Sequence, residues 1–135
     1  MARVLFVCVH NAGRSQMAEA LFRARNQELG SEHKATSAGT LGAGEINPVC
    51  VEALSEIGVS VKGQYPKVLD PGLVEAADII VSMGCGVDAE ACPTRFLVTE
   101  GWGLDDPKGQ PIEVVRVIRD LIREKVDDLL GRLSG

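Results

Sequence analysis

The chain has 135 residues, enough for one well-buried core and too few for two ordinary domains, so we expect a single domain over residues 1–135. It carries 14 Lys and Arg against 19 Asp and Glu, a net charge of −5, and it has no basic run that would follow a nucleic-acid backbone. The apolar stretch near the N-terminus is too short for a signal peptide, and no run approaches the length of a membrane span. We therefore expect a soluble cytoplasmic protein without a nucleic-acid or membrane partner, and a monomer.

Strand-like and helix-like segments alternate along the first third of the chain. Residues 4–7 form a continuous apolar run, typical of a strand that is buried on both faces. Apolar residues then recur at helical spacing over 15–29, and Gly30 is placed to end that helix. Residues 34–38 predict a second strand of weaker apolar content, and the three glycines within 39–45 indicate a loop.

The middle of the chain predicts two helices that each begin at a proline. The first covers 48–57, with Asn47 as its N-cap and Gly58 closing it. Residues 59–67 read mostly as loop. A short helix follows over 71–76.

The rest of the chain predicts two strands, 78–83 and 95–98, and a long helix over 111–133 with apolar residues along one face. Strands separated by helices are typical of the α/β class, with a parallel sheet covered on both faces. We expect a three-layer sandwich with a central four-stranded parallel sheet. Ligands of such sheets bind at the carboxyl ends of the strands.

The segment CVHNAGRS lies between the first strand and the first helix and carries a nucleophile. Its backbone amides can turn inward around a tetrahedral anion, and the following helix adds its positive N-terminal end. The same field favours a thiolate at Cys8. Arg14 can bind two oxygens with its planar fork, and Ser15 can donate to the sulfur. The predicted binding residues are Val9, His10, Asn11, Ala12, Gly13, Arg14 and Ser15.

Two further thiols, Cys85 and Cys92, lie seven positions apart in a segment of small residues. On a helix they would share one face, too far apart to bond without unwinding, so the pair is a plausible redox switch. Simple packing is one alternative. Zinc is another, although it needs four ligands and only His10 and His33 remain to assist, so we expect no metal site. We interpret Cys50 as a packing residue and His33 as an exposed loop residue.

An acidic loop over 101–107 follows the last predicted strand. Pro107 holds the preceding residue in an extended backbone, and an acid at the rim of an anion site can protonate a leaving oxygen. We favour Asp106 over Asp105 for that role. An ordinary turn, or a cap for the final helix, is the alternative.

Taken together, these motifs resemble the thioredoxin-coupled arsenate reductases, which share the low-molecular-weight tyrosine phosphatase fold. The resemblance rests on CVHNAGRS followed by QMAE, on TSAG at 36–39, on the spacing of Cys85 and Cys92, and on WGLDDP at 102–107. It covers nearly the whole chain. The first motif alone would indicate only the superfamily, and the cysteine pair makes the match specific for reduction.

The resemblance implies that Cys8 attacks arsenate held by Arg14 and the loop amides, while Asp106 protonates the departing oxygen. Cys85 then attacks Cys8, which releases arsenite and leaves a Cys8–Cys85 disulfide. Cys92 takes over by exchange, and thioredoxin reduces the resulting Cys85–Cys92 disulfide. No cofactor is implied.

The chain departs from the family pattern at a cation site. Some members bind potassium with residues matching Asn11, Glu19 and Ser37 plus an aspartate. Lys67 stands where that aspartate would be, and its ammonium can fill the site, so we expect no bound potassium. A related group couples to mycothiol, but the second thiol, Cys92, favours thioredoxin.

The main alternative is a phosphatase acting on phosphotyrosine or a small phosphoester, because phosphate and arsenate have nearly the same shape and charge. It would use Cys8, Arg14 and Asp106 in the same way. The acid loop offers no aromatic ledge for a phenol ring, which favours the reductase and leaves weak phosphatase activity as a by-product. A redox-sensing or arsenic-binding module ranks third, because it makes no use of Arg14 or Asp106.

Overall fold

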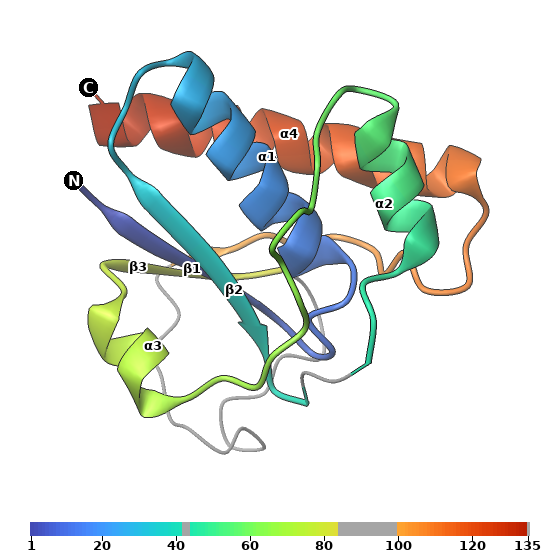
Figure 1. The fold of residues 1–135 in the computed structure, drawn as a ribbon, viewed down its shortest axis with the longest axis horizontal. Helices are drawn as coiled ribbons and strands as arrows, with labels where there is room; N and C mark the ends of the chain where they lie inside the picture. The colour runs from blue at the N-terminus through green and yellow to red at the C-terminus, as the bar shows by residue number, and fades with distance from the viewer. Residues whose placement is uncertain (42–43, 84–99, 135) are drawn as a thin grey trace.

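The computed structural model describes residues 1–41, 44–83 and 100–134. It has three layers, with a parallel sheet in the middle (Figure 1). The strands run in the order β2-β1-β3-β4, with bounds β1 Arg3–Cys8, β2 Lys34–Gly39, β3 Ile79–Ser82 and β4 Glu100–Gly101. On one side of the sheet lie α1 (Arg14–Glu28), α2 (Pro48–Ser55) and α4 (Ile112–Ser134). The other side carries α3 (Pro71–Ala76), and the predicted fold class is confirmed.

Strand β1 lies in the middle of the sheet, and its successive residues pack alternately into two hydrophobic cores, one on each face. Val4, Phe6 and Cys8 face α1 and α4, and Phe6 packs its ring 5.5 Å from that of Trp102. Leu5 and Val7 point to the opposite face and pack with residues near α3. Burial on both faces explains why the strand reads as an unbroken apolar run.

Helix ends differ from the prediction by one or two residues. Helix α1 begins at Arg14, and Gly30 follows it with a φ of 67°, as its placement predicts. Helix α2 ends at Ser55 instead of Ile57, because the N–H groups of Ile57 and Gly58 bond to carbonyls three residues back and form a tight turn. His33 is half-buried, not exposed, and its Nδ1 accepts a hydrogen bond from the Ala2 N–H.

The predicted fourth strand, 95–98, lies outside the described residues. The described fourth strand is β4, which pairs with Val81 and Ser82 of β3. After β4 the chain buries Trp102, Leu104 and Pro107, so this loop is anchored to the body of the protein.

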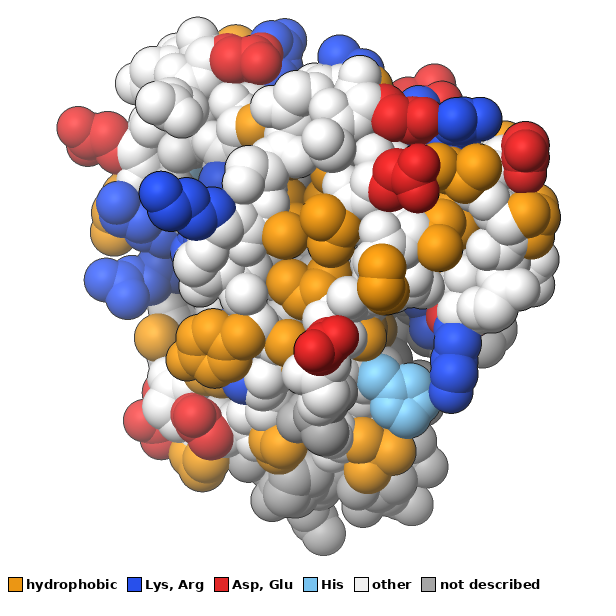
Figure 2. Space-filling model, turned by 45° about the vertical axis from the view of Figure 1, so that its right-hand side comes forward, with side chains coloured by type: hydrophobic (Ala, Val, Ile, Leu, Met, Phe, Trp, Pro, Cys, Tyr) orange, Lys and Arg blue, Asp and Glu red, His pale blue; other side chains and the backbone are white. Residues whose placement is uncertain are grey.

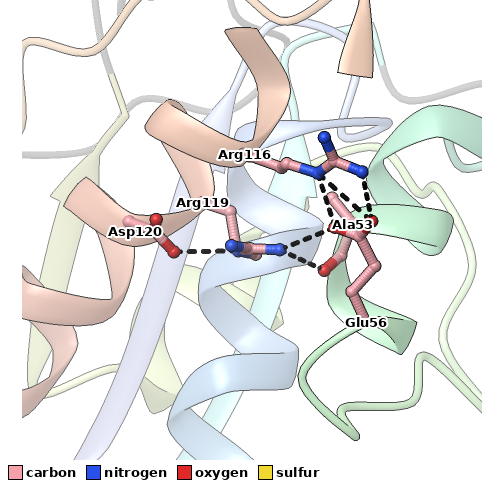
Figure 3. Close-up of polar contacts among 5 residues, drawn as sticks. All are labelled: Ala53, Glu56, Arg116, Arg119 and Asp120. Carbon is pink, nitrogen blue, oxygen red and sulfur yellow. Dashed lines mark hydrogen bonds and ion pairs between the residues drawn. The ribbon is translucent and has the colours of Figure 1, made fainter. Parts of the chain in front are cut away.

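Helix α4 buries the apolar face that its periodicity predicts and is joined to α2 by a polar clamp. Its buried face consists of Val115, Ile118, Ile122, Val126 and Leu129. In the clamp, Arg119 donates to the Ala53 carbonyl at 2.8 Å and to Glu56 Oε1 at 3.0 Å, as Figure 3 shows. Arg116 holds the same Glu56 carboxylate at 2.6 Å from the solvent side. The clamp fixes the C-terminal end of α2 against α4.

On the face that Figure 2 shows, hydrophobic side chains gather toward the middle, and acidic and basic side chains are interspersed around them. At the left edge of this view several Lys and Arg side chains lie side by side. None of the described helices combines the length and the apolar character needed to cross a bilayer.

The strand order places a crevice at the carboxyl ends of β1 and β3. From β1 the sheet continues to β2 on one side and to β3 on the other, which is the point where open parallel sheets bind ligands. Cys8 is the last residue of β1, and the loop after it lies in this position.

Candidate active site

A pocket of about 320 Å³ opens where β1 ends and α1 begins. Three segments that are far apart in the sequence form it: the loop after β1, the approach to α2, and the loop after β4. Its lining residues are Cys8, Val9, His10, Ala12, Gly13, Arg14, Glu45, Asn47, Asp106, Pro107 and Lys108. The sequence-predicted nucleophile, cation and acid therefore lie around one cavity.

Cys8 is nearly buried, with 3% of its surface exposed, and its Sγ lies 2.7 Å from Ser15 Oγ. Asn11 Nδ2 donates to the same Ser15 oxygen at 2.8 Å. That bond uses a lone pair of the hydroxyl and leaves its hydrogen for the sulfur. Since a thiolate only accepts, Ser15 is the donor when Cys8 is ionised.

The loop between Cys8 and α1 turns backbone toward the pocket and keeps two polar side chains beneath it. Asn11 has a φ of 54°, in the left-handed region, and it is fully buried. Asn11 and Ser15 do not line the pocket, so they support the loop while its backbone faces the cavity. Within the described residues no side chain caps the N-terminus of α1 at Gly13, which leaves the N–H groups of the first turn available to an anion.

Arg14 is 6% exposed and divides its guanidinium between protein and pocket. Its Nη1 donates to the Leu104 carbonyl at 2.8 Å and lies 3.4 Å from the Met83 carbonyl. Its Nε is buried without a partner among the described residues. A buried donor without an acceptor is costly, so the unpaired nitrogen points to an oxyanion ligand.

Asp106 lies at the rim of the pocket, with 56% of its side chain exposed and its Oδ2 4.0 Å from Arg14 Nη2. Its Oδ1 accepts from the Lys108 N–H at 3.0 Å. Pro107 packs against the loop at Gly13, where an added Cβ would meet Pro107 Cγ at 2.9 Å. Only glycine fits that contact. Asp105 is not among the lining residues.

Cys50 is fully buried and packs in the core, as the sequence interpretation expects. Its nearness to the site was not predicted: its Sγ would lie 3.7 Å from a Cβ at Gly13. Burial raises the pKa of Cys50 to about 12, and the charges of Asp106 and Cys8 add to the effect. Cys50 therefore stays a neutral thiol near neutral pH.

Sequence reasoning missed Glu45, Asn47 and Lys108 as lining residues. Asn47 is a helix cap, as predicted, and its Oδ1 accepts from the Val49 N–H at 2.9 Å. Its own N–H also donates to the Ala12 carbonyl at 2.7 Å, which ties α2 to the loop. No local pattern carries that contact, because it depends on how the approach to α2 folds back over the sheet.

The residues that match the family's potassium ligands are already engaged with protein donors. Ser37 donates to Glu19 Oε1 at 2.7 Å, and Arg23 lies 3.2 Å from Glu19 Oε2. The Lys67 N–H donates to Asn11 Oδ1 at 3.0 Å. Burial lowers the pKa of Lys67, while the attraction of Glu19 opposes that shift. With Arg23 on Glu19 and a lysine beside it, this donor set does not fit a potassium ion.

Other predicted residues cannot be placed. Cys85 and Cys92 lie outside the described residues. In the part of the chain that is described, no group of three or more His, Cys, Asp and Glu side chains is arranged to hold a metal ion.

Comparison with known proteins identifies the family to which the chain belongs. Residues 3–135 match the family model of the low molecular weight phosphotyrosine protein phosphatases. A glutaredoxin arsenate reductase from Synechocystis is 31% identical, with 99% of this chain and 100% of the relative aligned. A putative arsenate reductase from Halobacterium salinarum is 39% identical over 96% of this chain and 91% of its own length.

Two solved structures share the fold over almost the full length. An arsenate reductase in its phosphate-binding state superposes with a TM-score of 0.80 at 30% identity, covering 98% of both chains. A low molecular weight protein tyrosine phosphatase from T. tengcongensis gives a TM-score of 0.82 at 28% identity, covering 98% of this chain and 99% of that one. The chain is therefore an enzyme of the low molecular weight phosphotyrosine protein phosphatase family, to which it belongs together with these arsenate reductases.

Proposed function

We propose that this enzyme reduces arsenate to arsenite, with Cys8 as the nucleophile. The observation that carries the proposal is the unpaired buried Nε of Arg14, the residue that begins α1 at its uncapped N-terminus and lines the same pocket as Cys8. A tetrahedral oxyanion satisfies both sets of donors at once and brings its central atom to the sulfur. The two relatives named arsenate reductases support arsenate over phosphate as the substrate.

The first step forms a bond between Cys8 Sγ and arsenic and breaks one arsenic–oxygen bond. The departing oxygen takes a proton from Asp106, whose carboxyl group lies at the rim of the pocket, and leaves as water. Arg14 and the first-turn amides of α1 hold the remaining oxygens throughout. Ser15 donates to the sulfur before the attack and so keeps the thiolate in place.

The second step transfers the electrons. The thiolate of Cys85 attacks the sulfur of Cys8, a disulfide forms, and the sulfur–arsenic bonding pair stays on arsenic, which is reduced from As(V) to As(III). Cys92 then attacks Cys85 and frees Cys8. The two electrons that arsenic gains are those lost by two thiols.

Thioredoxin is the reductant we propose for the Cys85–Cys92 disulfide, in the cytoplasm, where thiol systems keep cysteines reduced. The name of the Synechocystis relative makes glutaredoxin the competing reductant. The second thiol supports thioredoxin, because an internal disulfide between neighbouring cysteines is a substrate for dithiol exchange. The proposed reaction uses no cofactor.

The test follows NADPH consumption with arsenate, thioredoxin and thioredoxin reductase, and repeats the assay with glutaredoxin and glutathione. We expect arsenate-dependent turnover with thioredoxin, none in Cys85→Ser, and near-normal turnover in the control Cys50→Ala. In Cys92→Ser, peptide mapping after one turnover should find a Cys8–Cys85 disulfide. A Cys8–Cys50 disulfide there would show that the relay is assigned wrongly.

A phosphatase is the second candidate, because the family model and several structural relatives carry that activity in their names. Among the described residues, none of those lining the pocket is Phe, Tyr or Trp, which disfavours an aryl phosphate. Rapid hydrolysis of an aryl phosphate without arsenate-dependent NADPH loss would favour the phosphatase and reject the reductase.

A further inference from the structure

A chain of side-chain hydrogen bonds connects a surface segment to Cys8, and no step proposed above uses its outer half. Gln64 is half-buried in the segment between α2 and α3. Its Nε2 donates to Gln16 Oε1 at 2.8 Å and lies 3.1 Å from the Gln16 carbonyl oxygen. Gln16 is fully buried in the first turn of α1, and its own Nε2 donates to both Asn11 Oδ1 and the Asn11 carbonyl at 3.0 Å.

The direction of each bond in this chain is fixed by a backbone group. The Lys67 N–H only donates, so the Asn11 atom that faces it is the oxygen. The Asn11 carbonyl only accepts, so the Gln16 atom that faces it is the nitrogen. The Gln16 carbonyl likewise requires the nitrogen of Gln64. Turning any one amide over would set like atoms against each other, so all three orientations are determined.

The inner end of the chain is the Ser15 hydroxyl. With the oxygen of Asn11 turned to Lys67 and Gln16, its Nδ2 is turned to Ser15 Oγ, and the Ser15 hydrogen is left for the Cys8 sulfur. Asn11 holds this position in a left-handed backbone conformation that non-glycine residues adopt only when their surroundings enforce it. Gln16 supplies two of the enforcing bonds.

We propose that Gln64 is a positioning residue for the nucleophile. By donating to the buried Oε1 of Gln16, it fixes the amide that holds Asn11, and through Asn11 it keeps the Ser15 hydroxyl directed at Cys8. Without Gln64, a fully buried acceptor loses its donor, and the Gln16 amide relaxes toward solvent. The proposal rests on the proposed function only in taking Cys8 as the nucleophile.

The test measures how fast iodoacetamide alkylates Cys8 as a function of pH, without arsenate or a reductant partner. Trypsin releases Cys8 alone in the peptide Val4–Arg14, so mass spectrometry reads this thiol separately from the other three cysteines. Gln64→Met keeps the length of the side chain and removes its donor. We expect alkylation at neutral pH to slow roughly threefold to tenfold, the value of one hydrogen bond, and the midpoint of the pH profile to move upward.

Two variants distinguish positioning from a general loss of stability. Gln64→Glu sets a carboxylate against the two acceptor oxygens of Gln16 and should move the midpoint further than Gln64→Met. Gln27→Met, on the exposed surface of α1, should leave the profile unchanged. The ionisable groups around Cys8 are His10, Arg14, Glu45, Asp106, Lys108 and the buried Cys50. Gln64→Met and Gln27→Met leave this set unchanged, whereas Gln64→Glu adds one carboxylate at residue 64.

Coincident profiles for the wild type and Gln64→Met would overturn the proposal, as would a Gln64→Glu midpoint no higher than that of Gln64→Met. Thermal unfolding at the same pH values shows that each variant is folded during the assay. Because alkylation requires no arsenate turnover, these outcomes do not depend on whether the enzyme is a reductase.

Discussion

Arg14 combines two tasks that are usually assigned to different residues. Its Nη1 joins the Leu104 and Met83 carbonyls, which lie in the middle of the acidic loop 101–107 and just after β3. Its Nε has no partner among the described residues, and in the proposed function it binds the substrate oxyanion. A lysine in this place would keep the charge and lose the fork, so it could not serve both sides at once.

The Cys50 thiol makes stability depend on pH in the alkaline range. Burial raises its pKa from 9.0 to about 12, so between these values the unfolded chain has lost a proton that the folded chain keeps. Stability is complete below about pH 9 and falls as pH rises toward 12. We expect the urea-unfolding free energy of the reduced protein to drop by about 1 kcal/mol more than that of Cys50→Ala between about pH 8 and pH 10.

Cys50→Ala also controls for the titration of tyrosines and lysines, because the variant and the wild-type protein contain the same ones. The comparison concerns the change with pH, so the cavity left by the shorter side chain, a constant cost, cancels. An equal alkaline decline in both proteins would contradict the raised pKa of Cys50.

At the scale of residues, the sequence predicts the site residues whose type and order the chemistry requires. It misses the residues that only tertiary packing places near the site. Cys8 and Arg14 were predicted because a nucleophile and an oxyanion ligand need a strand, a loop and a helix in that order. The placement of Asp106 followed from Pro107. Cys50 and Gln64 reach the site from distant segments, and neither is marked by a local pattern.

At the scale of elements, buried and exposed side chains alternate along the loop after β4, and the buried ones hold it in place. Trp102, Leu104 and Pro107 are buried, while Gly103, Asp105 and Asp106 face outward. The indole of Trp102 also donates to Glu100 at 2.7 Å. The loop therefore presents Asp106 from a fixed support, and its position follows from three buried neighbours more than from the acid itself.

The clamp between α2 and α4 is the interaction between elements that we expect to matter most for stability. The Arg119 side chain is 90% buried and bonds a helix-end carbonyl as well as a carboxylate. Arg119→Met leaves the Ala53 carbonyl without this donor, while Glu56 keeps its bonds to Arg116. We expect a loss of about 1–3 kcal/mol in the urea-unfolding free energy. Faster amide exchange at the end of α2 should accompany it.

Arg116→Met is the matched control for the clamp, because Arg116 bonds the same Glu56 carboxylate from an exposed position. Exposed ion pairs contribute little, so this variant should lose less stability than Arg119→Met. Equal losses would mean that the carboxylate pairing, and not the buried bond to Ala53, carries the effect.

The elements themselves differed in how well they could be predicted. The apolar stripe of α4 and the apolar run of β1 carry their periodicity in the sequence, and both were predicted. The described residues of strand β4, Glu100–Gly101, include no apolar side chain, so their place depends on pairing with β3. The predicted helix 48–57 extends two residues beyond the observed end of α2 at Ser55, because the turn before Gly58 retains helix-like local hydrogen bonds.

At the scale of the whole molecule, the position of Lys67 leads to a prediction of how potassium affects the melting temperature. It comes from the segment between α2 and α3, α1 contributes Glu19, and β2 contributes Ser37, so three parts of the chain converge at the position where the resemblance implies a cation site. We expect the melting temperature to be the same in potassium chloride and sodium chloride of equal ionic strength.

Lys67→Asp removes the ammonium and supplies a carboxylate, so in this variant potassium should raise the melting temperature above its value in sodium. Stabilisation of the wild-type protein by potassium would contradict the assignment of Lys67 to the cation position.

The open N-terminus of α1 makes the substrate part of the fold. A helix normally has a Ser, Thr, Asn or Asp side chain to accept from its first N–H groups, and here that acceptor arrives only with the oxyanion. In the proposed reaction arsenate takes the place of the N-cap of α1 and leaves with each turnover. We therefore expect a phosphate buffer to stabilise the fold, and we expect free energies of unfolding to be comparable between variants only at one fixed phosphate concentration.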